Sequence, residues 1–210
     1  MARRSIAYID GFNFYYGLLR GPHRDCKWLD FVSLFRAIRQ ADDLVAVKYF
    51  TAIWPDDSGE RHKVYLAARA QNPILEIVLG RFKSKTLECR VSSCLFGGSR
   101  RFRSFEEKET DVNIAVHMLD DAYRAACDIM VLVSADSDLM PAVNLVKTRF
   151  PSMRIAAYIP GPTERFRNAI ELRAGCHQAR TVPSNLLRNF QLPPRVALPG
   201  GAVAIKPQSW

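Results

Sequence analysis

The sequence contains no apolar run that approaches the length of a membrane span. Its first residues show no apolar stretch followed by a small-residue cleavage site, so a secretory signal peptide is not expected. Its five cysteines are odd in number and scattered through 210 residues, which argues against the disulfide framework of a small secreted protein. These absences predict a cytoplasmic protein that has no membrane contact.

Metal sites built on cysteine or histidine are also poorly supported. Cys89 and Cys94 supply only half of the ligands of a closed zinc site, and no second close pair follows them. His23, His62 and His177 are isolated and lack the spacing of metal ligands. We interpret the two cysteines as ordinary thiols on a loop, and the sequence leaves open whether they bind metal.

Positive charge is abundant and unevenly placed. The net charge is +9, and residues 149–210 hold nine basic and two acidic residues. A second basic cluster lies in residues 81–103. Such patches attract polyanions through counterion release, although a solubilising surface explains the charge equally well. We predict that nucleic acid is bound by six residues of this cluster and by Lys108 after it; the six are Arg81, Lys83, Lys85, Arg100, Arg101 and Arg103.

The order of periodic segments indicates an α/β fold. Short apolar runs that predict strands alternate with amphipathic stretches that predict helices. This alternation is typical of a doubly wound, mostly parallel sheet flanked by helices. The expected strands are 5–9, 44–53, 74–79, 128–134 and 153–159, and the expected helices are 29–40, 60–71, 109–126, 139–149 and 164–173.

Two segments depart from this pattern. Residues 80–107 are basic and without a sustained period, and we interpret them as an excursion that contains a hairpin through residues 87–96. Residues 183–210 contain several Pro and Gly residues and predict an irregular, flexible basic tail. One domain is therefore expected over residues 1–182.

Aspartates end two of the predicted strands and open one helix. Asp10 ends the first strand, Asp136 and Asp138 follow the fourth, and Asp111 lies in the first turn of the helix at 109–126. If the first and fourth strands are neighbours, these acids meet at one edge of the sheet. Converging carboxylates repel one another unless a cation lies among them, and hard oxygen ligands favour Mg²⁺ or Mn²⁺. Such an ion activates water for phosphodiester hydrolysis.

Each acid also has a purely structural interpretation. Asp10 precedes Gly11 and could shape a turn, Asp111 could complement a helix dipole, and Asp138 could cap a helix. The aromatic run from Phe12 to Tyr16 could stack bases, but such a run more often packs in a core. The metal hypothesis rests on the three segments together.

The same three segments resemble the motifs of NYN domains, and most closely those of the bacterial LabA-like branch. They are Asp10-Gly11-Phe12-Asn13, Glu107-Lys108-Glu109-Thr110-Asp111 and Val133-Ser134-Ala135-Asp136-Ser137-Asp138. The similarity runs from about residue 5 to 182.

This resemblance implies a PIN-like fold and a metal-dependent ribonuclease, a hydrolase that acts on single-stranded or structured RNA. It implies that Asp10, Asp111 and Asp136 hold the metal and that Asp138 is a fourth acid. It further implies that Asn13 orients substrate or a ligand and that Ser134 supports the loop. His117 departs from the pattern, because many relatives have an aspartate there.

Other functions remain open from the sequence. A non-catalytic RNA-binding adaptor would keep the basic surface while its acids bind metal poorly. A phosphatase of the haloacid dehalogenase type and a dinucleotide-binding protein are disfavoured, because the residues after Asp10 match neither signature. The sequence leaves the oligomeric state open, a homodimer included.

Overall fold

A single parallel sheet organises the molecule. The computed structural model describes residues 2–55 and 57–210. The sheet has six strands in the order β3-β2-β1-β6-β7-β8, and all neighbouring pairs are parallel. Its strands are β1 (Arg3–Asp10), β2 (Asp42–Thr51), β3 (Leu75–Leu79), β6 (Ile129–Val133), β7 (Arg154–Ile159) and β8 (Gln178–Thr181). The expected α/β class and parallel sheet are confirmed.

The strand order reverses between β1 and β6. From β1 the chain builds outward to β2 and β3, and it then returns to add β6, β7 and β8 on the other side of β1. β1 pairs with β6 from Ser5 to Ile9, so the predicted neighbourhood of these two strands is confirmed. Open α/β sheets bind their ligands beyond the carboxyl ends of the strands at such a reversal.

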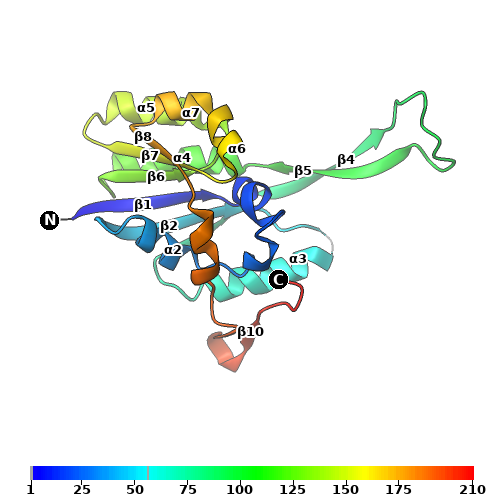
Figure 1. The fold of residues 1–210 in the computed structure, drawn as a ribbon, viewed down its shortest axis with the longest axis horizontal. Helices are drawn as coiled ribbons and strands as arrows, with labels where there is room; N and C mark the ends of the chain where they lie inside the picture. Colours follow the sequence, from blue (N-terminus) through cyan, green and yellow to red (C-terminus); the bar gives the residue numbers. More distant parts are fainter. Residues whose placement is uncertain (1, 56) are drawn as a thin grey trace.

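Helices cover both faces of the sheet because its central strands are apolar on both sides (Figure 1). Ala7 and Ile9 face one core cluster, and Ile6 and Tyr8 face the other. The result is three layers. The longer helices are α2 (Phe31–Ile38) and α3 (Asp57–Arg69), with α4 (Thr110–Tyr123) and α5 (Met140–Arg149).

Short elements join the layers. α1 (Gly11–Phe14) continues directly into a π-helical turn, η1 (Tyr15–Leu19). The single helix expected over 164–173 is interrupted at Ala169, whose ψ of 53° is not helical, and becomes α6 (Thr163–Asn168) and α7 (Ile170–Gly175). Three-residue 3₁₀ turns occur at Arg24–Cys26 (η2), Ser137–Leu139 (η3) and Pro199–Gly201 (η5), and a longer one at Ser184–Asn189 (η4).

The basic excursion forms an antiparallel hairpin of β4 (Arg81–Glu88) and β5 (Arg101–Lys108). It projects away from the body of the molecule (Figure 1). Arg81 pairs with Lys108 and Glu88 with Arg101, so the connection spans residues 89–100. A hairpin was expected through residues 87–96, but all of its strand residues except Leu87 and Glu88 lie outside that range, because no sustained period marks the strands in the sequence.

The C-terminal segment, residues 183–210, packs against the domain, and the prediction of a flexible tail was wrong. Leu187 is fully buried in the first core cluster. The indole nitrogen of Trp28 donates to the carbonyl oxygen of Pro193 at 2.8 Å. β9 (Arg195–Ala197) and β10 (Val203–Ile205) pair with each other, and Trp210 packs against Trp28 and Tyr65. These anchors are too widely spaced to form a sequence period.

Truncation of Leu187 tests whether this segment contributes to stability. We expect Leu187→Ala to lower the free energy of unfolding by about 2–5 kcal/mol, because it leaves a cavity in a closed core. Leu95→Ala is the matched control: Leu95 is 99% exposed, so its loss should change stability by about 0.5 kcal/mol or less. Equal denaturation midpoints for the two variants would show that the segment is not part of the cooperative fold.

Candidate functional site

Asp10 lies at the carboxyl end of β1, next to the reversal of strand order. Its side chain is 2% exposed and caps α1 by accepting the backbone N–H of Asn13 at 2.9 Å. Gly11 follows because a Cβ there would stand 2.7 Å from the carbonyl oxygen of Phe50 and 2.8 Å from the ring of Tyr49. The Asp-Gly pair therefore ends the strand and lets α1 pack closely on β2.

Ser134 joins the ends of β1 and β6. Its hydroxyl donates to Asp10 Oδ2 at 2.9 Å and accepts the backbone N–H of Asp136 at 3.0 Å. Because Ser134 is fully buried, these bonds fix the loop that carries Asp136 relative to Asp10. Two of the motifs predicted from sequence are thus connected through one hydroxyl group.

Asn13 connects Asp10 to a third segment. Its amide nitrogen donates to Asp10 Oδ2 at 2.7 Å, and its amide oxygen accepts from Arg165 at 2.6 Å and from the backbone N–H of Ala135 at 3.3 Å. Arg165 belongs to α6, after β7, and sequence reasoning did not select it. Its sequence signal is weak, because one arginine among many basic residues carries no spacing that marks a site.

Asp136 caps the 3₁₀ turn at Ser137–Leu139 by accepting the backbone N–H of Asp138 at 2.9 Å. Asp138 is exposed in the first turn of that 3₁₀ element, and α5 begins after Leu139. The interpretation of Asp138 as a helix cap was therefore wrong, because the capping role falls to Asp136 two residues earlier.

Electrostatic coupling shows that the acids share one environment. Burial raises the pKa of the Asp10 carboxyl, and the charge of Asp136 raises it further. Burial raises the pKa of Asp111 to about 6, with contributions from Asp10, Asp136 and Asp138. Each of these carboxyls is thus harder to ionise than an isolated one, as expected where negative charges gather.

Glu107, which precedes α4, also belongs to this group. Burial raises the pKa of its carboxyl to about 7, with further contributions from Asp10 and Asp111, although the hydroxyl of Thr110 donates to it. Glu107 lies within the second NYN-like motif, and no role was predicted for it from the sequence. The structure adds it to the acids around Asp10.

The donor set fits a hard divalent cation in type. These side chains offer only carboxylate and amide oxygens. Burial and their mutual negative charge raise their pKa values, and a bound cation would offset that charge. Within residues 2–55 and 57–210, however, no three acidic, histidine or cysteine side chains lie close enough together to hold an ion directly. Binding would need bridging water or rotation of the exposed carboxylates.

His117 lies apart from the acids. Its Nδ1 is 3.3 Å from the ammonium of Lys48 on β2, and its ring packs edge-on against Phe50. Lys48 is buried but paired with Asp121 at 2.7 Å. The residue that departs from the family pattern therefore serves packing of α4 on β2.

An open groove lies beside Asn13 and Glu107. It encloses about 330 Å³ and has an aromatic wall in which Trp54 stacks on Phe82 at 4.3 Å between ring centroids. Arg165 supplies a positive charge in the groove. Its described lining residues are Phe12, Asn13, Tyr16, Trp54, Phe82, Phe105, Glu107 and Arg165.

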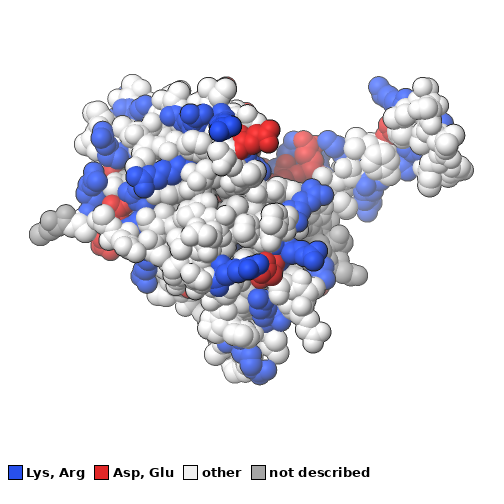
Figure 2. Space-filling model, in the orientation of Figure 1, with Lys and Arg blue, Asp and Glu red and all other residues white. Residues whose placement is uncertain are grey.

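The hairpin distributes its basic residues over two faces. The register places Lys83 opposite Glu106 and Lys85 opposite Ser104 on one face. Arg101 and Arg103 alternate with these and share the other face with Phe105 and Glu107, which line the groove. In Figure 2 basic side chains lie along the hairpin, and acidic ones gather where it leaves the body.

Several predicted RNA-binding residues are already engaged with acids. Arg81 pairs with Glu109 at 2.6 Å, and Lys85 and Lys108 pair with Glu106 at 3.0 and 2.9 Å. Arg100 donates to the carbonyl oxygen of Cys94 in the hairpin tip. Cys89 and Cys94 are both free thiols near that tip. Among the described residues, no ion pair occupies Lys83, Arg101 or Arg103.

The raised pKa of Asp111 predicts a stability effect whose sign depends on pH. Its folded pKa of about 6 exceeds its usual value of 3.8, so ionisation destabilises the metal-free fold as pH rises through 6. Asp111→Asn removes this cost. For a half-buried group we expect a gain of about 1 kcal/mol at pH 8, or about 2–4 °C in Tm, which disappears near pH 4.

The matched control is Asp120→Asn, which removes an exposed charge from the same helix, where Asp120 pairs with Arg124. Its effect on Tm in a chelator should not grow as pH rises from about 4 to about 6, the range over which the effect of Asp111→Asn develops. A difference between Asp111→Asn and the parent that stays constant from pH 4 to pH 8 would contradict the raised pKa of Asp111.

Comparison with known proteins identifies the family. The NYN domain model matches residues 4–178. The chain is 30% identical over 240 aligned positions to 6-hydroxy-3-succinoylpyridine 3-monooxygenase HspA of Pseudomonas putida. This alignment covers 99% of this chain and 75% of that protein. A crystal structure of a protein of unknown function from Vibrio parahaemolyticus superposes with a TM-score of 0.57 at 18% identity, covering 91% of this chain and 97% of that one.

The described part of the chain contains no helix that is long and apolar enough to cross a membrane. The doubly wound sheet agrees with the PIN-like fold that the resemblance implied, and the family model spans all three aspartate motifs. The chain belongs to the NYN domain family, a branch of the PIN-like nucleases.

Proposed function

We propose that this protein is a metal-dependent ribonuclease that hydrolyses phosphodiester bonds within RNA. The observation that carries the proposal is the coupled group of acids at the reversal of strand order, in a family whose members are PIN-like nucleases. Asp10, Asp111 and Asp136 are the proposed metal ligands, and Asp138 is a fourth acid within electrostatic range of Asp111.

A bound Mg²⁺ or Mn²⁺ would supply an activated water and would offset negative charge on the reacting phosphate. The protein's own groups prepare the site for that ion. Ser134 and Asn13 both donate to Oδ2 of Asp10, which holds its carboxylate in one orientation. Arg165 binds the amide oxygen of Asn13, so its positive charge lies beside the site without neutralising a ligand directly.

Aromatic side chains would receive the bases. Phe12, Trp54 and Phe82 line the groove beside Asn13 and Glu107, and single-stranded nucleic acid stacks its bases on such rings. Arg101 and Arg103 extend the same face of the hairpin away from the groove. We propose that they bind phosphates of the RNA chain, and that Lys83 and Lys85 on the opposite face contribute less.

Replacement of Asp136 tests catalysis. Asn caps helical turns as well as Asp, so Asp136→Asn should fold and keep the turn at Ser137–Leu139. We expect cleavage of RNA in Mg²⁺ or Mn²⁺ to fall by at least about a hundredfold, because a lost metal ligand removes several kcal/mol of charge stabilisation.

Asp120→Asn is the control for loss of one negative charge and should retain parental activity. Full activity per folded molecule of Asp136→Asn would contradict the assignment. Parental protein that binds RNA but does not cleave it in either metal would favour the non-catalytic RNA-binding adaptor.

The two faces of the hairpin permit a matched test of RNA binding. The double variant Arg101→Glu, Arg103→Glu should weaken RNA binding and reduce the slope of log affinity against log salt by about 1.4, at about 0.7 for each single-strand phosphate contact. The double variant Lys83→Glu, Lys85→Glu introduces the same charge change on the other face. Equal losses in both variants would contradict a preferred face.

A further inference from the structure

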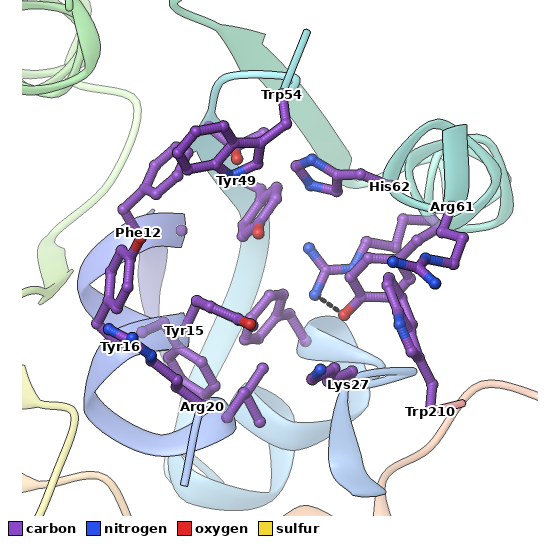
Figure 3. Close-up of a pocket in the computed structure, with 17 residues that line it drawn as sticks. Phe12, Tyr15, Tyr16, Arg20, Lys27, Tyr49, Trp54, Arg61, His62 and Trp210 are labelled. Carbon is purple, nitrogen blue, oxygen red and sulfur yellow. Dashed lines mark hydrogen bonds between the residues drawn. The ribbon is translucent and has the colours of Figure 1, made fainter. Parts of the chain in front are cut away.

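A second cavity, separate from the acids, lies between α1, η1, α2, β2 and α3. It encloses about 370 Å³, within the usual range of small-molecule sites. Figure 3 shows Phe12, Tyr16 and Trp54 along one side and Arg61 and Trp210 along the opposite side. Trp210, from the C-terminal segment, thus completes a wall of this cavity.

Arg69, the last residue of α3, is the unusual group in this cavity. It is a lining residue, yet its side chain is only 2% exposed. Its guanidinium carbon lies 4.0 Å from the ring centroid of Phe31, 4.1 Å from that of Tyr49 and 3.8 Å from that of Tyr65. The guanidinium is therefore held among three aromatic rings at close contact.

The charge of Arg69 has no anionic partner among the described residues. One of its nitrogens, Nη2, donates to the hydroxyl of Tyr65 and lies 3.4 Å from the carbonyl oxygen of Leu29. Nε and Nη1 are buried without a hydrogen-bond partner. None of the described residues that line the cavity is an aspartate or a glutamate.

A buried guanidinium without a counter-charge is costly. Arginine stays protonated in proteins, so it cannot relieve the cost by losing its proton. Contacts with aromatic faces offset only part of the desolvation. Lys48, the other described buried cation of the sheet region, shows the usual solution, because it pairs with Asp121 at 2.7 Å.

The surroundings are positive as a whole. Arg20, Lys27 and Arg61 line the same cavity. Burial and the charge of Arg69 together lower the pKa of the His62 imidazole to about 4. Burial and the charges of Arg61 and Arg24 lower the pKa of the Lys27 ammonium. The cavity therefore disfavours further positive charge and favours an anion.

We propose that this cavity binds a small aromatic carboxylate, with its ring between the aromatic walls and its carboxylate at Arg69. The walls supply flat apolar faces. Arg69 supplies two nitrogen donors, Nε and Nη1, that have no hydrogen-bond partner in the protein, and the three surrounding rings hold its guanidinium in place. A carboxylate carries one negative charge, which balances the one buried guanidinium, and Arg recognises carboxylates with directional hydrogen bonds.

This site is independent of the proposed ribonuclease activity. Phe12, Tyr16 and Trp54 line both this cavity and the groove beside Asn13, so they stand between the two. The groove contains the acid Glu107, whereas the described lining of the cavity contains none. Binding here requires neither a metal nor the aspartates.

Calorimetric titration in a metal chelator tests the proposal. The probes are a panel of single-ring aryl carboxylates with spacers of different length, the matching carboxamides, cyclohexane carboxylates, uridine 5′-monophosphate and inorganic phosphate. We expect at least one aryl carboxylate to bind at least about tenfold more tightly than its carboxamide, its cyclohexane analogue and both phosphates. Its binding should also raise the pKa of His62, measured by NMR.

Arg69→Met keeps much of the side-chain bulk and removes the buried charge, and should weaken binding of that carboxylate by at least about thirtyfold. Arg124→Met, at an exposed surface position, is the control and should bind as the parent does. Asp136→Asn should also bind as the parent does, which separates this site from the nuclease proposal.

Three outcomes would overturn the proposal. They are no binding of any aryl carboxylate up to millimolar concentration, equal affinity for a carboxylate and its carboxamide, and tighter binding of uridine 5′-monophosphate, which would make the cavity a nucleotide site. If Arg69→Met does not fold, the comparison of carboxylate with carboxamide on the parent, together with the shift of the His62 pKa, decides the question.

Discussion

The parallel pairing of β1 with β6 is the constraint on which the candidate site depends. It brings the ends of two strands that are more than a hundred residues apart in the chain to one edge of the sheet. The hydroxyl of Ser134 then bonds both to Asp10 and to the backbone of Asp136. Without this pairing Asp10 would cap a short helix and nothing more, and the acids would have no common environment.

Charge separates the two sides of the aromatic wall formed by Phe12, Tyr16 and Trp54. On one side, burial and the charges of neighbouring carboxyls raise the pKa values of the acids, and that of Glu107 reaches about 7. On the other side, burial and the charge of Arg69 lower the pKa of His62 to about 4. Each side thus holds an excess of one sign, and each is suited to a ligand of the opposite charge: a cation beside Asp10 and an anion beside Arg69.

Sequence patterns predicted the elements that depend on interactions between residues close together in the chain. Apolar runs predicted β1, β2, β3, β6 and β7 within a few residues, because strands buried on both faces must be continuously apolar. The aspartate motifs followed from the rule that sites lie beyond the carboxyl ends of parallel strands. Short β8 was missed, since four residues that are partly exposed carry little pattern.

What the sequence did not predict depends on contacts between distant segments. Arg165 donates a hydrogen bond to Asn13, which is 152 positions away in the chain, and no sequence spacing predicts that bond. Leu187 and Trp210 anchor the C-terminal segment through contacts with the rest of the domain. The Pro and Gly residues of this segment led to the prediction of a flexible tail instead. The cavity around Arg69 is lined by residues of α1, η1, α2, β2 and α3 together with Trp210. Composition revealed the positive charge but gave no sign of where it is buried.

The central claim is that Asp10, Asp111 and Asp136 hold one divalent cation. A crystal soaked in Mn²⁺, with diffraction data recorded at the manganese absorption edge, tests this claim most directly. The account predicts an anomalous peak bounded by these three carboxylates, bound directly or through water, that is absent from crystals of Asp136→Asn. A peak at another position in protein that cleaves RNA in Mn²⁺, or the same peak in Asp136→Asn, would contradict it.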